Sequence, residues 1–284
     1  MNLQENIQRI KEVMGLITEE ITPECQQTAK NTLLLAVKYW KDWLNHPVTK
    51  EKFMVNHQVD EKKLNEIYAK YLSMLDSLDF TFYDNTYQFP NYSDSDLLVK
   101  SATEMDDIYA FVSRRHPNTI FYNCSLSDTD IKNTLIHEIS HLIDYIHPKS
   151  TAKQINKVFS QNIKPNKIAG LRKFIIKLGV TDENELKKII DRYIKMVEKK
   201  SNYDCDLIEK LANIQIMRSI LNKQPGENIT LLDLKPYITF QKELPDDIGW
   251  FISCWADRGF SDLEKQLNDM NLLVKQGTQK SNLA

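Results

Sequence analysis

The stretch from Thr134 to Pro148, TLIHEISHLIDYIHP, is the feature that most constrains how this chain can fold. It contains His137, Glu138 and His141 in the order HExxH. Two histidines four residues apart lie on the same face of a helix, one turn apart, so both imidazoles can reach one metal ion. The motif therefore predicts a helix that carries two zinc ligands, with a carboxylate beside the first of them that can act on a water.

The residues around the motif have the period of an amphipathic helix. With about 100° per residue and His137 at zero, His141 lies near 40° and Asp144 near −20°. The apolar residues of the stretch lie around 180°: Leu135, Ile139, Leu142 and Ile146. We expect this helix to run from about Asp128 to about His147, with Pro148 at its end. Because both histidines point away from the apolar stripe, the pattern favours a metal site over a packed core position.

The composition excludes several classes of function. The chain has 284 residues, 42% of them hydrophobic and 27% charged, which is typical of a globular protein. A net charge of −2 without a basic patch argues against a nucleic-acid partner. No run approaches the length and apolarity of a membrane span, so we expect no membrane insertion. The N-terminus also lacks the basic and apolar regions of a secretory signal peptide.

The four cysteines, Cys25, Cys124, Cys205 and Cys254, lie far apart in the sequence. Without a CxxC pair they indicate neither a disulfide scaffold nor a cysteine zinc site. They are expected to be reduced thiols of a cytoplasmic protein, or of one that is delivered elsewhere without a classical signal peptide.

The order of the patterns predicts an α+β fold that is predominantly helical. Only 7 glycines occur, and no phosphate-binding or dinucleotide-binding motif is present. Residues 1–80 are expected to form a helical N-terminal subdomain, 81–275 the domain with the HExxH helix, and 276–284 a flexible tail. Apolar residues recur at helical spacing in nine segments: Ile7–Ile17, Pro23–Leu44, Leu64–Leu75, Ala152–Phe159, Lys167–Leu178, Glu183–Lys199, Asp206–Leu221, Asp247–Trp255 and Asp262–Leu273.

Three short strands are expected between these helical parts: Leu97–Val99, Ile108–Ser113 and Thr119–Asn123. The aromatic and polar stretch Phe80–Ser93 is typical of an irregular loop. Together the strands would form a small sheet beside the HExxH helix. The last strand could have an exposed edge that pairs with an extended peptide, or it could be internal to the sheet.

A catalytic zinc usually needs a third protein ligand. HExxHxxDxxH, ending at His147, resembles the metzincin pattern HExxHxxGxxH, in which a glycine breaks the helix so that the third histidine folds back. Here Asp144 replaces that glycine and the helical spacing continues. In a continuing helix His147 would lie about 15 Å along the axis from His137, too far to share a metal.

Glu209 is the other candidate, in DLIEKLANIQIMRSIL. This segment resembles the gluzincins, in which a glutamate on a downstream helix is the third ligand and a small residue one turn later permits close helix packing. More narrowly, the chain resembles the catalytic domain of the anthrax lethal factor family. The matching positions are His137, Glu138, His141, Asp144, Tyr203, Glu209 and Ala212. The alternative is that Glu209 is an ordinary surface carboxylate.

These resemblances imply a zincin-like, zinc-dependent peptidase that acts on a peptide or protein substrate. His137, His141 and Glu209 would hold Zn²⁺, Glu138 would be the general base, and Tyr203 would donate a hydrogen bond to the developing oxyanion. Asp144 could orient a ligating histidine or simply face solvent. The alternative function is a non-catalytic helical binding or scaffold protein with a structural or decayed zinc site. The sequence does not indicate an oligomeric state.

Overall fold

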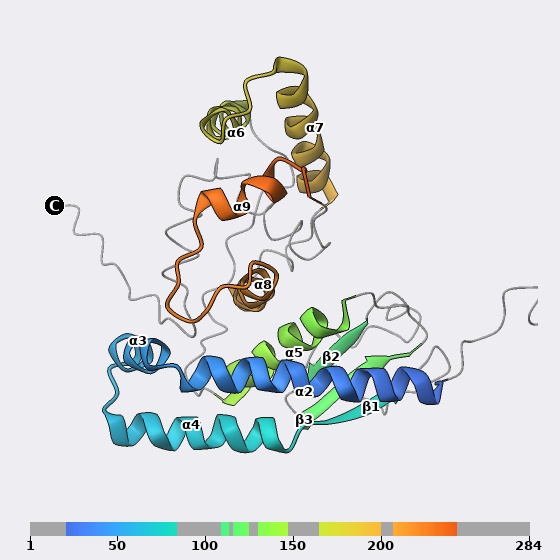
Figure 1. Cartoon of the computed structure of the whole chain (residues 1–284), viewed down its shortest axis with the longest axis vertical. Coiled ribbons are helices and arrows are strands. Elements are labelled where there is room, and N and C mark those ends of the chain that lie inside the picture. The colour runs from blue at the N-terminus through green and yellow to red at the C-terminus, as the bar shows by residue number, and fades with distance from the viewer. Residues whose placement is uncertain are drawn as a thin grey trace, which may run out of the picture. The chain divides into compact units, whose positions relative to one another are not determined.

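A computed structural model of the chain describes residues 21–83, 109–113, 116–124, 130–146, 165–199 and 207–242 (Figure 1). These residues form eight helices and one three-stranded sheet. The expectation of a predominantly helical α+β chain is therefore confirmed. Within the described segments, no helix has both the length and the apolarity needed to cross a membrane.

The elements follow the chain in a simple order. They are α2 (Pro23–Asn45), α3 (Pro47–His57), α4 (Glu61–Asp76), β1 (Asp79–Tyr83), β2 (Ala110–Ser113), β3 (His116–Asn123), α5 (Ile131–Ile146), α6 (Pro165–Lys177), α7 (Glu183–Lys199), α8 (Leu207–Ile220) and α9 (Leu231–Ile238). The predicted helices at α2, α4, α5, α6, α7 and α8 are confirmed. Four other predicted helices and the predicted tail lie outside the described residues.

β3 is the central strand of the sheet. It pairs in parallel with β1, where Tyr83 lies opposite Asn123, and antiparallel with β2, where Phe111 lies opposite Phe121. The alternative of an internal last strand is thus the correct one, and β2 is an edge strand among the described residues. The predicted strands at β2 and β3 are confirmed, whereas the predicted strand at Leu97–Val99 lies outside the described segments.

The expectation of an irregular loop from Phe80 onward is wrong for its first four residues. Phe80–Tyr83 belong to β1, because the alternating aromatic residues of this run suit a pleated strand and every one of them pairs with β3. The rings of Phe80 and Phe82 lie 5.0 Å apart, and each also contacts the ring of Tyr122. Aromatic cross-strand pairs of this kind stabilise a sheet.

The chain divides into two compact units. Unit 1 consists of residues 1–41 and 70–146, and it contains the sheet, α5 and most of α2. In this unit α5 packs on β2 and β3. α2 is joined to α5 by the indole of Trp40, which donates a hydrogen bond to the main-chain oxygen of Ile136 over 3.2 Å.

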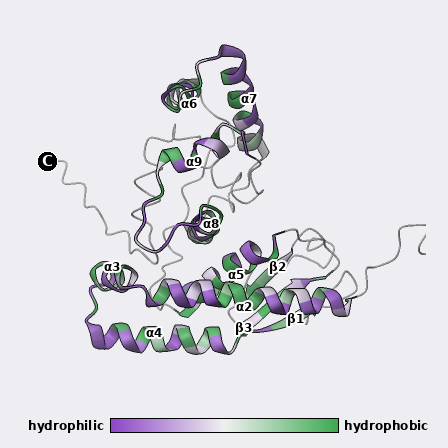
Figure 2. Cartoon of the chain, viewed as in Figure 1, coloured by the Kyte–Doolittle hydropathy of each residue, from purple (hydrophilic) through white to green (hydrophobic). Residues whose placement is uncertain are grey.

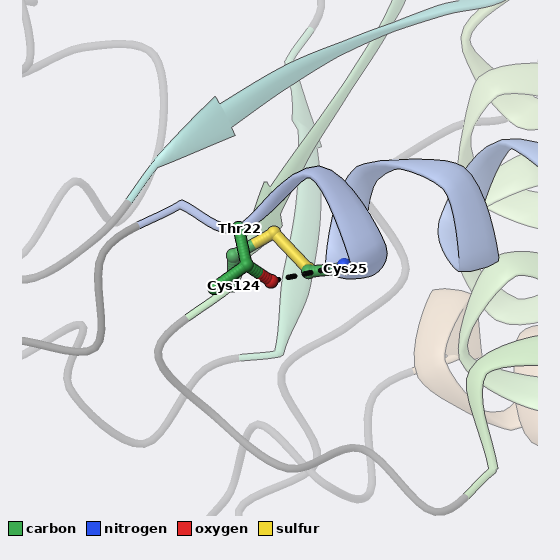
Figure 3. The surroundings of a disulfide bond; sticks show 3 residues. All are labelled: Thr22, Cys25 and Cys124. Carbon is green, nitrogen blue, oxygen red and sulfur yellow. Dashed lines mark hydrogen bonds between the residues drawn. A yellow bond between two sulfur atoms is a disulfide. The ribbon is translucent and has the colours of Figure 1, made fainter.

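A disulfide in unit 1 corrects the expectation of four reduced thiols. Cys25, in the first turn of α2, is bonded to Cys124, which directly follows β3, with a Cα–Cα distance of 6.0 Å (Figure 3). The main-chain N–H of Cys25 also donates to the hydroxyl of Thr22. Sequence spacing failed here because the partners are 99 residues apart and only the fold brings them together. The disulfide therefore removes the reduced-thiol basis for expecting a cytoplasmic location.

Unit 2 consists of residues 42–69 and 147–284, and its core is apolar. α6 packs on α7, and their buried faces join residues of α8 and α9 in one cluster. Its fully buried side chains are Leu171, Ile175, Tyr193, Ile214, Ile229, Leu234 and Ile238. Figure 2 shows hydrophobic and hydrophilic residues side by side along α7, as expected for a helix with one face in such a core.

Two short helices of unit 2 were not expected from the sequence. His46 caps α3, where its ring nitrogen Nδ1 accepts a hydrogen bond from the N–H of Val48. Thr230 and Asp233 form a capping box at the start of α9. For these two helices the cap residues are a stronger sequence signal than the apolar spacing.

Candidate metal centre

α5 places the HExxH motif within a regular helix. The helix runs from Ile131 to Ile146, which confirms the expected helix within a few residues at each end. At its start the main-chain oxygen of Asp130 accepts hydrogen bonds from the N–H groups of Asn133 and Thr134. Because the helix is unbroken from Ile131 to Ile146, the two histidines keep the i, i+4 relation that the motif requires.

His137, Glu138 and His141 form a group that could hold a metal ion. One ligand atom from each of the three side chains lies within 4.8 Å of the other two, and the imidazole ring centres of His137 and His141 are 4.7 Å apart. Two nitrogens bound to one tetrahedral Zn²⁺ at about 2.0–2.1 Å are roughly 3.3–3.4 Å apart. The donors are of the types that zinc prefers, so the group fits this ion.

The polar face of α5 is buried. Glu138 is 8% exposed, His141 7% and Asp144 3%, while His137 is half-buried. The alternative that Asp144 faces solvent is therefore wrong, because the face of the helix opposite the apolar stripe is also covered. Burying a carboxylate is costly unless it is paired, hydrogen-bonded or close to a metal ion. Two buried carboxylates beside two imidazoles are an environment that favours a cation.

Tyr83 adds a phenol to the surroundings of this group, and the sequence did not indicate it. Burial raises the pKa of Tyr83 above its ordinary value, and the negative charge of Glu138 raises it further. A hydrogen bond with the side chain of Asn123 acts in the opposite direction but does not outweigh them. Tyr83 therefore stays a neutral hydroxyl at ordinary pH, in electrostatic contact with Glu138. The alternating aromatic residues of β1 were the available signal.

The described part of the chain does not show the other predicted site residues near this group. Glu209 lies in the first turn of α8, but its side chain is outside what the structure describes. Tyr203 and His147 lie outside the described residues altogether. Ala212, the small residue one turn after Glu209, is fully buried. The predictions for Glu209, Tyr203 and His147 thus stay predictions.

Comparison with known proteins gives no relative. No protein-family model, no curated protein and no solved structure matches the chain. The resemblance to the lethal factor family therefore depends on the motif residues alone. The side chains that α5 brings together are the basis for the proposed function.

Proposed function

We propose that this protein is a zinc-dependent peptidase that hydrolyses peptide bonds in a peptide or protein substrate. The observation that carries the proposal is the group of His137, Glu138 and His141, whose ligand atoms lie within 4.8 Å of one another on one helix. A packed core would not need two imidazoles and a carboxylate on the same buried face. A hydrolytic metal site needs this combination of residue types.

The two histidines would be the first two ligands of the metal, through one ring nitrogen each. We propose Glu209 of α8 as the third ligand, following the gluzincin resemblance. When bound, Zn²⁺ supplies Lewis acidity, which polarises a carbonyl group and lowers the pKa of a coordinated water to about 7. Asp144 lies one turn after His141 and is buried with it. Its carboxylate is suited to accept the second ring N–H of a ligating histidine and so to fix its orientation.

Glu138 would be the general base. It is next to His137 in the sequence and has its carboxylate in the same group, which supports a role in taking a proton from the attacking water. The same carboxyl group would then deliver this proton to the nitrogen of the leaving amine. The neutral phenol of Tyr83 is close enough for its pKa to respond to the charge of Glu138, so it forms part of the surroundings of this carboxylate. Tyr203 remains the proposed donor to the oxyanion.

The sheet offers a place for an extended substrate. β3 is paired on both sides, whereas β2 pairs only with β3 among the described residues and packs against α5. A peptide that adds to the edge of β2 that has no partner among the described residues would form main-chain hydrogen bonds with Ala110–Ser113. Such pairing is independent of the substrate side chains. It would hold a scissile carbonyl close to the helix that carries the metal group.

The test measures zinc content and turnover separately. We expect the wild-type chain to bind zinc and cleave members of a peptide library. The Glu138→Gln variant should keep the metal but lose turnover by about 10²–10⁴-fold, the usual contribution of a general base. His141→Ala should lose both. Glu185→Gln is the matched control, because Glu185 is an exposed glutamate of α7.

Two further variants identify the third ligand. If Glu209→Gln loses the zinc and His147→Ala keeps it, the proposed ligand set holds, and the reverse result would replace Glu209 by His147. A protein that binds zinc tightly without cleaving any peptide would instead favour the scaffold alternative. In that case the metal should have four protein ligands and no exchangeable water.

A further inference from the structure

α2 contacts both ends of the segment that leads from the sheet to the metal group. This segment begins at Cys124, directly after β3, and ends at Ile136, directly before His137. At its beginning, Cys124 is bonded to Cys25 in the first turn of α2 (Figure 3). At its end, the oxygen of Ile136 accepts a hydrogen bond from the indole of Trp40.

The contact at Ile136 is well placed to orient His137. Trp40 is 0% exposed, so its N–H group cannot exchange this partner for water without opening the core. The accepting carbonyl belongs to the peptide group that joins Ile136 to His137. A rotation of this part of the helix would move the ring of His137. The same rotation would stretch the hydrogen bond from Trp40 to Ile136.

The contact at Cys124 fixes the other end of the segment. Besides the disulfide, the main-chain N–H of Cys124 donates to the oxygen of Tyr83 over 3.0 Å, so the same residue is attached to β1 and to α2. Cys25 and Trp40 are 15 residues apart in the sequence, which corresponds to about 22 Å along a helix. α2 therefore holds the segment at two well-separated points.

We propose that α2 is the positioning element of the metal group, that Trp40 is a positioning residue for His137, and that the Cys25–Cys124 disulfide makes the metal affinity sensitive to the redox state. The proposal rests on the proposed function in one respect, namely that the group binds a metal ion. It adds that the affinity for the metal ion depends in part on residues of α2, which do not bind the metal themselves.

The redox step is an ordinary thiol–disulfide exchange. Two molecules of a low-molecular-weight thiol such as glutathione supply two electrons and two protons. The sulfur–sulfur bond between Cys25 and Cys124 breaks, two protein thiols form, and the glutathione is oxidised to its own disulfide. Cys25 is half-buried and Cys124 is buried, so we expect the thiolate to attack on the Cys25 side of the bond. Reduction breaks the covalent link between Cys124 and α2. Of the two contacts between α2 and the segment, only the hydrogen bond from Trp40 to Ile136 then remains.

The first arm of the test replaces single indole groups. Trp40→Phe keeps a large buried ring but removes the N–H donor, and we expect zinc or Co²⁺ affinity to fall about tenfold, as is usual when a supporting partner of a ligand is lost. Trp43→Phe is the matched control, since Trp43 is a second buried tryptophan on α2. Its metal affinity should stay within about twofold of wild type. Competition with a chromophoric chelator, well below the unfolding temperature of each variant, measures both affinities.

The second arm changes the disulfide. Metal affinity is compared between oxidised wild type, wild type reduced with a phosphine that does not bind zinc, and Cys25→Ser. We expect reduced wild type and Cys25→Ser to bind metal about tenfold more weakly than oxidised wild type. Amide hydrogen exchange of α5 in the metal-free protein should become faster in Trp40→Phe and in the reduced protein, but not in Trp43→Phe. The controls Cys205→Ser and Cys254→Ser should behave as wild type.

The outcomes separate this proposal from the peptidase assignment. Equal metal affinities for Trp40→Phe and Trp43→Phe, or for oxidised and reduced protein, would overturn the positioning role. A protein that binds metal with the expected differences but hydrolyses no peptide would overturn the proposed function and leave the positioning role intact. If the wild type binds no metal, the proposed function fails, and unchanged exchange of α5 amides would then overturn the positioning role as well.

Discussion

α5 and α7 are both amphipathic helices, yet only one of them follows the usual rule for a surface helix. α7 buries Leu186, Ile189, Ile190 and Tyr193, while the charged residues between them are exposed. α5 buries its apolar stripe too, but the polar face with Glu138, His141 and Asp144 is equally covered. Stability alone does not require buried carboxylates and imidazoles, and it is usually lowered by them. Such a covered polar face is what the proposed metal site would require of α5.

Both helices have a buried apolar face. The largest losses of stability should come from cavities made in these faces. Ile139 of α5 is fully buried and Ile189 of α7 is buried. Replacing either one with alanine is expected to lower the free energy of unfolding by about 2–5 kcal/mol. Urea denaturation followed by circular dichroism measures this loss.

Only one of the two cavities should affect the site. Ile139 lies between Glu138 and His141 in the sequence, so Ile139→Ala should also weaken metal binding, whereas Ile189→Ala should not. Equal metal affinities for both variants would show that the apolar stripe of α5 has no part in orienting its polar face.

Alkaline pH should reveal two buried tyrosines: Tyr83, which is in electrostatic contact with Glu138 of α5, and Tyr193, which lies on α7. Burial raises the pKa of Tyr83 and of Tyr193 above the ordinary 10.0, and for Tyr83 the charge of Glu138 adds to this. In the unfolded chain both hydroxyls begin to ionise near pH 10, whereas in the folded chain they stay protonated to higher pH. The stability they contribute is therefore complete below pH 10 and is lost above it, at up to about 1.4 kcal/mol per pH unit for each tyrosine.

Phenylalanine variants separate the two contributions. Tyr83→Phe and Tyr193→Phe should each flatten the decline of unfolding free energy between pH 10 and 11, measured by urea denaturation at closely spaced pH values. Because Tyr193 donates to the oxygen of Ile238 over 3.0 Å, its variant should also be less stable at neutral pH. A decline as steep as in wild type for both variants would contradict the assignment.

Replacing one aspartate on each helix should have the smallest effect on stability. The two replacements should nevertheless differ clearly in their effect on metal affinity. Asp144 of α5 is buried and Asp191 of α7 is exposed. Asp144→Asn should weaken metal binding about tenfold by removing a carboxylate partner of a ligating histidine. Asp191→Asn should leave metal affinity unchanged and alter the unfolding free energy by less than about 0.5 kcal/mol. If both variants bind metal as well as wild type, Asp144 does not support the ligands.

The features that the sequence predicted correctly depend on residues close to one another in the chain. The HExxH helix, its apolar stripe and the grouping of His137, Glu138 and His141 follow from helical spacing within one segment. The disulfide, the internal position of β3 and the charge of Glu138 acting on Tyr83 depend on pairings between distant segments, which periodicity does not contain. Asp144 illustrates the limit: spacing placed it on the ligand face, but it did not show that this face would be covered.

The discontinuous path of the chain through unit 2 has a consequence for its synthesis. Val48, at the start of α3, packs against Gly226, where an added Cβ would lie 3.1 Å from its side chain, and Gly226 has the left-handed φ of 86°. A growing chain exposes Val48 long before Gly226 exists. At about 5–20 residues per second the interval between them is roughly 10–35 s. During that time Val48 lacks this native partner, so faster translation of residues 48–226 or a chaperone would limit the exposure of its side chain.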